Sequence, residues 1–260
     1  MTLVEATLFG ATDKVAVALE RLRTFEPPEG YWLAFSGGKD SQVVLDLSER
    51  AGVKFEAHQN LTTVDPPELL RFVRQEYAGR VSLDHPGTSM YKLIVQKRIP
   101  PTRRFRYCCE FLKERGGSGR MVVTGIRWAE SSRRSQRRMV ESCFRDGTKT
   151  YLHPIVDWSD EDVWEYLTLR GLPHCSLYDE GYERVGCVMC PIAWRHMRRE
   201  SERFPKFAAM YERACVAAYD RAVEDGLPRE TWKDGHDMYD WWIHGCNAEK
   251  SEGQMFPLDN

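Results

Sequence analysis

The sequence lacks the features that would place it in a membrane or in a repeat architecture. No stretch approaches the ~20 consecutive apolar residues of a bilayer-spanning helix. The first residues, Met1 to Glu5, have neither the basic start nor the apolar run of a secretory signal. We also find no internal repeat and no low-complexity segment. These absences predict a cytoplasmic globular protein that has no membrane partner.

The chain has little net charge, with 37 basic against 39 acidic residues. Bulk electrostatics therefore do not predict binding to nucleic acid. The distribution is uneven, however, because residues 97–145 contain fourteen Lys or Arg and four Glu. Arginines are suited to sulfate or phosphate, and their density here exceeds what one small anion needs. A polyanion is thus an open alternative to a small anionic ligand.

A glycine-rich turn follows the first buried strand pattern. Residues 31–35 predict a strand, and apolar residues at helical spacing in 43–47 predict a helix after the turn. The glycines allow backbone N–H groups to surround an anion at the start of that helix. The spacing of a Walker A loop is absent. The residues of the turn are Ser36, Gly37, Gly38, Lys39, Asp40 and Ser41, in which Lys39 supplies a charge and Asp40 a carboxylate for Mg²⁺.

Strand and helix patterns alternate along the chain, which predicts an α/β fold with a mostly parallel, Rossmann-like twisted sheet flanked by helices. The expected strands are 31–35, 54–60, 81–85 and 121–125, and the expected helices are 12–23, 66–73, 159–171 and 204–225. We expect an N-terminal helix in 1–30, a nucleotide-binding domain in 31–192 and a helical, Trp-rich extension in 193–260. Its tryptophans are expected to pack on the core more often than to stack on bases.

Eight cysteines in a reducing compartment favour metal binding or catalysis over disulfides. Cys108 and Cys109 are adjacent, and Cys187 and Cys190 form a C-x-x-C pair far downstream. Thiolate ligands suit either an iron–sulfur cluster or zinc. Cys175 is a fifth candidate, so four of five cysteines would bind the metal. Either Cys108 and Cys109 both join the C-x-x-C pair, or Cys175 replaces one of them.

The sequence SGGKDS resembles the pyrophosphate loop of ATP pyrophosphatases, which cut ATP between its α and β phosphates. Further motifs widen the resemblance to the phosphoadenosine phosphosulfate (PAPS) reductase family, from about Tyr31 to Pro191. They are Thr62–Glu68, Gly125–Arg127, His153–Ile155 before Asp157–Trp158, and Leu177–Gly181. The resemblance implies an adenine nucleotide alpha hydrolase-like fold. It also implies nucleotide contacts by Thr63, Asp65, Gly125, Arg127, Arg133 and Arg134 in addition to the loop.

The cysteine pattern is similar to that of adenylyl-sulfate (APS) reductases, and this similarity implies a [4Fe-4S] cluster. In those enzymes a lysine near the cluster corresponds to Lys113. The resemblance therefore implies catalytic roles for Lys39, Asp40, Lys113 and Arg127, and metal binding by Cys108, Cys109, Cys175, Cys187 and Cys190.

Two departures from the reductases favour a different reaction. Their loops are usually degraded, whereas this one is intact, and their C-terminal E-C-G-type motif is replaced by His244-Gly245-Cys246-Asn247. We therefore expect an ATP- and Mg²⁺-dependent sulfurtransferase that receives sulfur from a cysteine desulfurase. Its acceptor is expected to be nucleic acid, as in DNA phosphorothioation or tRNA thiolation.

Two alternatives stay open. The first is an APS or PAPS reductase that uses thioredoxin, with Cys246 as nucleophile. The second is a nucleic-acid-binding accessory protein whose cluster is structural. The sequence does not determine the oligomeric state, and a homo-oligomer is one option.

Overall fold

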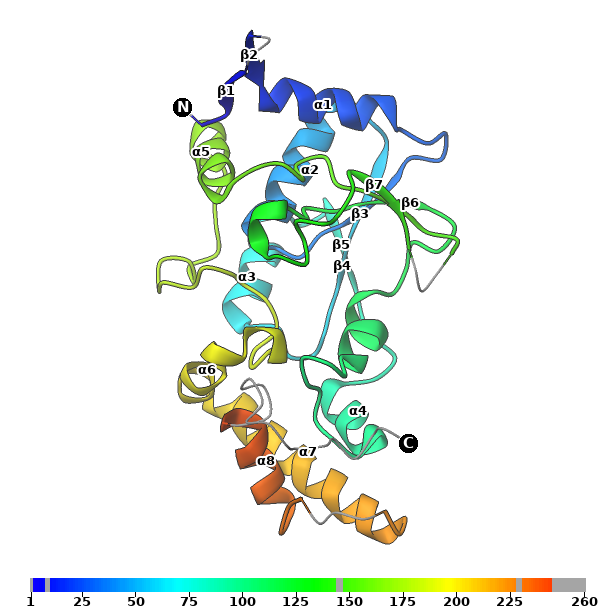
Figure 1. The fold of residues 1–260 in the computed structure, drawn as a ribbon, viewed down its shortest axis with the longest axis vertical. Helices are drawn as coiled ribbons and strands as arrows, with labels where there is room; N and C mark the ends of the chain where they lie inside the picture. Colours follow the sequence, from blue (N-terminus) through cyan, green and yellow to red (C-terminus); the bar gives the residue numbers. More distant parts are fainter. Residues whose placement is uncertain (1, 8–9, 144–146, 228–230, 245–260) are drawn as a thin grey trace. The chain divides into compact units, whose positions relative to one another are not determined.

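The computed structural model describes residues 2–7, 10–143, 147–227 and 231–244 (Figure 1). The chain divides into two compact units, each built from several segments. The first unit comprises Met1–Leu61, Asp65–His85 and Arg115–Gly186, and the second comprises Thr62–Val64, Pro86–Glu114 and Cys187–Asn260.

The first unit is built on a six-stranded sheet with the order β5-β4-β3-β6-β8-β7. Its parallel strands are β3 (Tyr31–Ala34), β4 (Phe55–Asn60), β5 (Val81–Asp84), β6 (Met121–Val123) and β8 (Thr150–Leu152), and β7 (Val140–Ser142) is antiparallel to β8. The predicted mostly parallel sheet is confirmed.

The strand order reverses between β3 and β6. The chain runs outward from β3 through β4 to β5, and then returns to pair β6 with the other side of β3. The loops that leave β3 and β6 consequently diverge at the carboxyl edge of the sheet. A reversal of this kind creates the crevice where open α/β sheets bind their ligands.

Helices of the first unit follow the sequence signals closely. They are α1 (Lys14–Thr24), α2 (Lys39–Ala51), α3 (Pro67–Glu76) and α5 (Asp160–Arg170), and a short hairpin of β1 (Val4–Thr7) and β2 (Gly10–Asp13) precedes them. Helix α2 is the most deeply buried, with Val43, Val44 and Leu47 fully inaccessible to solvent. Each such side chain contributes ~1.5–3 kcal/mol of hydrophobic free energy. The buried helix therefore fixes the position of the loop before it.

The second unit is helical and contains α4 (Met90–Lys97), a π-helical turn η1 (Cys109–Lys113), a 3-10 helix η3 (Pro191–His196), α6 (Met197–Arg203), α7 (Pro205–Glu224) and α8 (Gly235–His244). Trp242 of α8 is fully buried; its ring centroid lies 4.8 Å from that of Tyr211, and its Nε1 donates to the Pro101 carbonyl at 2.7 Å. Trp241 packs against Trp232. These tryptophans pack the second unit, as expected.

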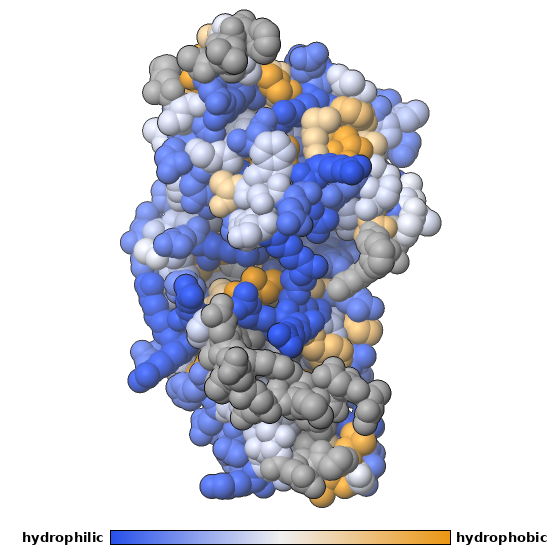
Figure 2. Space-filling model, viewed as in Figure 1, coloured by the Kyte–Doolittle hydropathy of each residue, from blue (hydrophilic) through white to orange (hydrophobic). Residues whose placement is uncertain are grey.

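Hydrophilic residues dominate the face shown in Figure 2, where apolar residues gather only in small areas outside the grey atoms. The large apolar side chains that lie exposed come from separate elements, such as Leu169 of α5 and Val223 of α7. In the described part of the chain, no helix combines the length and apolar character needed to cross a bilayer.

Candidate functional site

The glycine-rich loop joins β3 to α2 as predicted. Gly37 has φ +74°, and a Cβ atom there would lie 2.7 Å from the side chains of Leu69 and Val73. Both the positive φ and the close packing on α3 require glycine. Gly38 is the N-cap of α2 and provides no side-chain cap. The first N–H groups of a long helix, with its positive dipole end, thus lie in this loop.

The two serines shape the loop from within. Ser41 donates its hydroxyl to the Gly38 carbonyl at 2.8 Å and accepts the Ser36 N–H at 3.2 Å. The Ser36 hydroxyl accepts the Gly38 N–H at 3.4 Å. These short-range bonds hold the backbone in its curled form without help from a ligand.

A buried arginine links the loop to the start of α5. Arg127 is 1% exposed, and its Nε donates to Asp40 Oδ1 at 2.6 Å. Its other nitrogens donate to Asp160 and, at 3.2 Å, to the Trp158 carbonyl. Lys39 is also buried, with Nζ 3.4 Å from Asp160 Oδ1. Two cations and two carboxylates therefore form one ionic group at the carboxyl edge of the sheet.

The charges in this group stabilise one another. Burial disfavours the ionised form of Asp160, but the hydrogen bond from Arg127 and the charge of Lys39 outweigh it and hold the pKa of Asp160 below its usual value. For Arg127, desolvation is likewise outweighed by Asp40 and Asp160, so its pKa is raised. Both groups are charged at neutral pH, and the two cations of the ionic group are balanced by its two carboxylates.

Tyr178 covers the start of α2. Its hydroxyl accepts the Lys39 N–H at 3.0 Å, and its ring centroid lies 5.8 Å from Lys39 Nζ. Lys39 Nζ also donates to the Glu183 carbonyl at 3.3 Å. Burial raises the pKa of Tyr178, which keeps the hydroxyl neutral. The segment that carries Tyr178 thus occupies donors that a phosphate group would use.

Gly125 packs directly against the first turn of α2. A Cβ atom at Gly125 would lie 2.9 Å from the backbone carbon and oxygen of Asp40. We expect Gly125→Ala to displace the start of α2, to weaken nucleotide binding at least tenfold, and to lower the free energy of unfolding by about 1–3 kcal/mol. Denaturation and nucleotide titration measure the two effects. Gly87→Ala is the control, since open space surrounds a Cβ there; equal behaviour of the two variants would contradict the prediction.

The remaining predicted nucleotide contacts are distributed over both units. Asp65 is buried in the first unit, whereas Thr63 belongs to the second unit and its hydroxyl accepts the Met90 N–H at 3.0 Å. Arg134 forms an ion pair with Glu130, and Arg133 lies exposed. Of the predicted residues, the structure brings together the loop, Gly125 and Arg127. The roles of Thr63, Asp65, Arg133 and Arg134 remain predictions.

Four of the five candidate cysteines lie in the second unit. The Cys108 thiol donates a hydrogen bond to the Cys109 sulfur, which raises the pKa of Cys108; burial and the charges of Cys109, Cys187 and Cys190 raise it further. The same bond, with Lys113 and Arg106, lowers the pKa of Cys109 against the effect of burial. The four thiols from two distant segments therefore lie within electrostatic reach of one another, and Lys113 acts on one of them.

Cys175 has a different environment. It belongs to the first unit, where it is fully buried and where desolvation raises the pKa of its thiol. Among the residues that the structure describes, no three His, Cys, Asp or Glu side chains are arranged to hold a metal ion. The four thiols of the second unit are close but are not set around a single ion. Cys246 lies outside the described residues.

A buried carboxyl lies beside the C-x-x-C segment. Glu200 of α6 accepts the N–H of Met189, which lies between the two cysteines and has φ +55°. Burial raises the pKa of Glu200 to about 7. The unfolded carboxyl has a pKa of ~4.3. The folded state thus holds its proton more tightly, and the free energy of unfolding falls as the pH rises between these two values.

Glu200→Gln keeps an acceptor for Met189 and removes the charge. We expect this variant to be more stable than the natural protein by about 1–3 kcal/mol at about pH 8, and to match it at about pH 4, where Glu200 is protonated. Urea denaturation at both pH values measures the difference. A destabilisation of equal size at both would show that the carboxyl is not titrating in the folded state.

The sequence did not predict two residues of the site. These are Asp160, which belongs to the ionic group, and Tyr178, which covers the start of α2. In the sequence, Asp160 belongs only to the start of an expected helix, and Tyr178 only to a family motif. Asp160 lies in the acidic first turn of α5, after the N-cap Ser159. That position gave no indication that it would face a lysine far away in the sequence. The available signal for Asp160 was the group of carboxylates in this first turn. Such a group has a purely local explanation, because negative charge is favourable near the N-terminus of a helix.

Comparisons with known proteins find relatives in sequence and in fold. An uncharacterized protein of Methanocaldococcus jannaschii is 30% identical over 212 residues, which cover 77% of this chain and 50% of that protein. A PAPS reductase of Xanthomonas campestris is 37% identical over 82 residues, which cover 31% of this chain and 33% of that enzyme. The chain thus spans half or less of the length of these curated relatives.

Among solved structures, the PAPS reductase of Candida auris in its phosphate complex has a similar fold, with a TM-score of 0.50 and 18% identity over 65% of this chain and 87% of that one. The sequence family described as the phosphoadenosine phosphosulfate reductase domain matches residues 30–193. That match includes the loop before α2, Arg127, Tyr178 and all five candidate cysteines. The chain therefore belongs to the phosphoadenosine phosphosulfate reductase domain family.

Proposed function

We propose that the chain is an ATP-dependent sulfurtransferase that adenylates its acceptor and releases pyrophosphate. The observation that carries the proposal is the intact loop at the start of α2, which joins buried Lys39 and buried Arg127 at the reversal of strand order. Adenylation converts a poor oxygen leaving group into AMP, and sulfur then displaces the AMP. Members of this family include enzymes, among them the PAPS reductases named above.

The loop supplies donors for the pyrophosphate that leaves. Phosphate oxygens would replace the Tyr178 hydroxyl at the Lys39 N–H and receive the charge of Lys39 Nζ. Preorganised donors of this kind stabilise charge that builds on a leaving group. Arg127 is held beside the loop by its hydrogen bonds to Asp40 and Asp160.

Magnesium suits the carboxylates of this site, since Asp40 offers Oδ2 in addition to the oxygen bound by Arg127. When bound, Mg²⁺ would neutralise phosphate charge as the bond between the α and β phosphates breaks. Asp40 is the residue that we propose to hold it.

A [4Fe-4S] cluster is our proposal for the thiol group of the second unit, with Cys108, Cys109, Cys187 and Cys190 as ligands. A four-iron cluster is larger than one ion, so its thiolate ligands lie further apart than those of a zinc site. The four thiols of the second unit suit such a cluster, because they influence one another's pKa without enclosing a single ion. The cluster would supply or carry the sulfur that a cysteine desulfurase delivers. Cys175 is left as a separate buried thiol.

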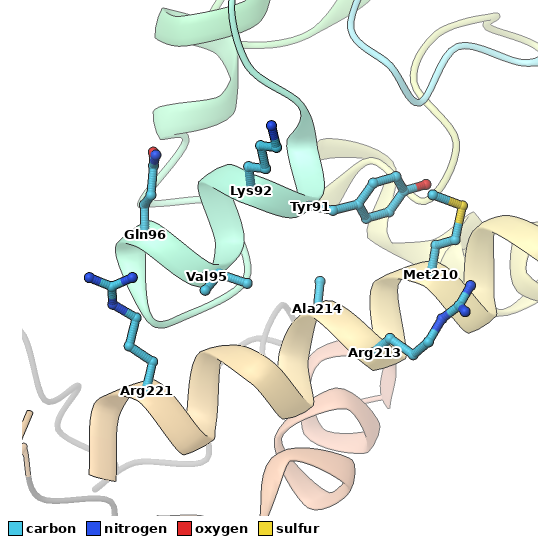
Figure 3. A pocket seen from close by; sticks show the side chains of 8 residues that line it. All are labelled: Tyr91, Lys92, Val95, Gln96, Met210, Arg213, Ala214 and Arg221. Carbon is cyan, nitrogen blue, oxygen red and sulfur yellow. The ribbon is translucent and has the colours of Figure 1, made fainter. Parts of the chain in front are cut away.

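A groove of the second unit supports nucleic acid as the acceptor. It lies between α4 and α7, and its lining includes Lys92, Arg213 and Arg221. Figure 3 shows Arg213 at the same end as Tyr91 and Met210, and Arg221 at the other end. None of its lining residues is acidic. A row of cations from two helices suits a chain of phosphates better than one small anion.

The acceptor is identified by an anaerobic assay of pyrophosphate release from ATP with single- and double-stranded DNA, transfer RNA and APS as separate additions. We expect release to depend on a nucleic acid and binding to weaken as salt increases. Salt-dependent binding without any turnover would instead support an accessory protein. Equal release of pyrophosphate with every added acceptor would show that the nucleic-acid part of the proposal is wrong.

The second candidate is an APS or PAPS reductase, because a curated PAPS reductase is 37% identical to part of this chain. It predicts sulfite formation from APS or PAPS with reduced thioredoxin, and loss of sulfite in Cys246→Ser. Sulfite formation that depends on Cys246 would replace the sulfurtransferase proposal.

A further inference from the structure

Three side chains that the proposed function does not use form a continuous hydrogen-bonded line across the sheet. Thr124 follows β6 directly, and its Oγ1 lies 2.7 Å from Nδ1 of His153, which follows β8. On the far side of the ring, His153 Nε2 lies 3.3 Å from Oε1 of Glu141 in β7. Three neighbouring strands thus present a hydroxyl, an imidazole and a carboxylate in order.

The order of the partners determines where the protons are. A carboxylate oxygen accepts hydrogen bonds, so beside Glu141 His153 carries its proton on Nε2 and leaves Nδ1 as an acceptor. The Thr124 hydroxyl therefore donates to Nδ1. His153 is fully buried, and desolvation lowers its pKa, which favours this neutral ring. Glu141 raises that pKa, whereas the charges of Arg137 and Arg134 lower it.

The location of Thr124 connects this line to the nucleotide loop. It is the first residue after β6, beside the reversal of strand order, and it precedes Gly125, which packs on the backbone of Asp40. Thr124 is only half-buried, whereas His153 is shielded from solvent. Because its own hydrogen points to His153, the Thr124 oxygen has lone pairs free to accept a proton from a bound group.

We propose that Thr124, His153 and Glu141 form a proton relay for adenylation, in which Thr124 contacts the attacking group of the acceptor. The proposal rests on the proposed function. As the acceptor atom X of an X–H group bonds to the α phosphorus, the bond from that phosphorus to the bridging oxygen breaks and pyrophosphate leaves. The X–H proton passes to Thr124 Oγ1, and the hydroxyl proton of Thr124 passes to His153 Nδ1.

The relay balances without any redox partner. It gives an adenylated acceptor, pyrophosphate and an imidazolium that Glu141 stabilises, and His153 returns its proton to water after release. Thr124 is the catalytic residue, and His153 and Glu141 act through it. General base catalysis of this kind contributes ~10²–10⁴-fold to a rate.

Thr124→Val and Thr124→Ser are the matched test pair. Valine keeps the volume and removes the hydroxyl, whereas serine keeps the hydroxyl. We expect Thr124→Val to lower kcat for pyrophosphate release by ~10²-fold or more and Thr124→Ser to stay within about tenfold of the natural protein. Affinity for α,β-methylene ATP is expected to change by less than about twofold in both. A Thr124→Val variant with natural kcat would overturn the relay.

The pH profile separates a relay from a structural role. The rate is expected to rise with pH as His153 loses its proton. Glu141→Gln removes the carboxylate that raises the pKa of His153, so the acidic limb of the profile is expected to move to lower pH. An acidic limb that stays in place in this variant would contradict the relay.

Nitrogen NMR of the imidazole tests the relay without turnover. We expect His153 to be neutral at pH 7 with its proton on Nε2, and to titrate at a different pH in Thr124→Val. A charged ring, or a proton on Nδ1, would overturn the relay even if the enzyme adenylates an acceptor. If the natural protein releases no pyrophosphate with any acceptor, the proposed function is wrong. The NMR measurement would still show whether Thr124, His153 and Glu141 are hydrogen-bonded as described.

Discussion

We expect replacement of Lys39 by methionine to lower the proposed ATP-dependent release of pyrophosphate by about 10³-fold or more, because preorganised charge at a leaving group is worth several kcal/mol. Lys39 is buried at the start of α2, with its Nζ beside Asp160 and the Glu183 carbonyl. Methionine keeps an unbranched side chain and removes the charge together with the N–H donors of Nζ. Release of pyrophosphate under saturating ATP measures the effect on kcat, and titration with α,β-methylene ATP measures binding.

Lys206→Met is the matched control for this variant. Lys206 lies exposed near the start of α7 in the second unit, so its replacement is expected to leave both quantities unchanged. Pyrophosphate release at the natural rate in Lys39→Met would exclude the loop as the triphosphate site. An equal loss in both variants would indicate a general effect of lowered positive charge.

If the proposed cluster is present, replacement of Cys190 by serine is expected to remove the iron from protein that is prepared anaerobically. The natural protein is expected to contain about four irons per chain, and the variant less than about one, because loss of one of four thiolates destabilises a [4Fe-4S] cluster. Iron and sulfide counts with the visible absorption spectrum measure the change. The result follows from the convergence of four thiols in the second unit.

Cys175→Ser decides between the two ligand sets. Cys175 lies buried in the first unit, and burial raises the pKa of its thiol, which disfavours the thiolate. We therefore expect this variant to keep its iron. Loss of iron in Cys175→Ser, together with iron retained in either Cys108→Ser or Cys109→Ser, would show that Cys175 replaces one of the adjacent pair.

Local signals in the sequence predicted the elements that hold the nucleotide loop. The strand ending near Phe35 and the helix starting at Lys39 follow from a short apolar run, two glycines and a helical apolar face, all within a few residues of one another. The helix from Asp160 to Arg170 is similarly bounded by Ser159 and Gly171. In each case the forces that define the element act between sequence neighbours.

The side-chain arrangement within the site depended on long-range pairing that the sequence does not display. Glu141 meets His153 because β7 pairs antiparallel with β8, and neither strand was predicted. In the sequence His153 belongs only to a family motif, and no other histidine lies at a metal-like spacing from it. Its partners became visible only with the register of β6, β8 and β7. Tyr178 likewise reaches the loop through tertiary packing.

The most direct test of the account is the identity of the products that the protein forms from ATP. Phosphorus NMR of a reaction with Mg²⁺-ATP and a nucleic-acid acceptor is expected to show pyrophosphate together with AMP or an adenylated acceptor, since we propose that the loop binds the phosphates that leave. Formation of ADP and inorganic phosphate, or failure to bind ATP at millimolar concentration, would contradict it.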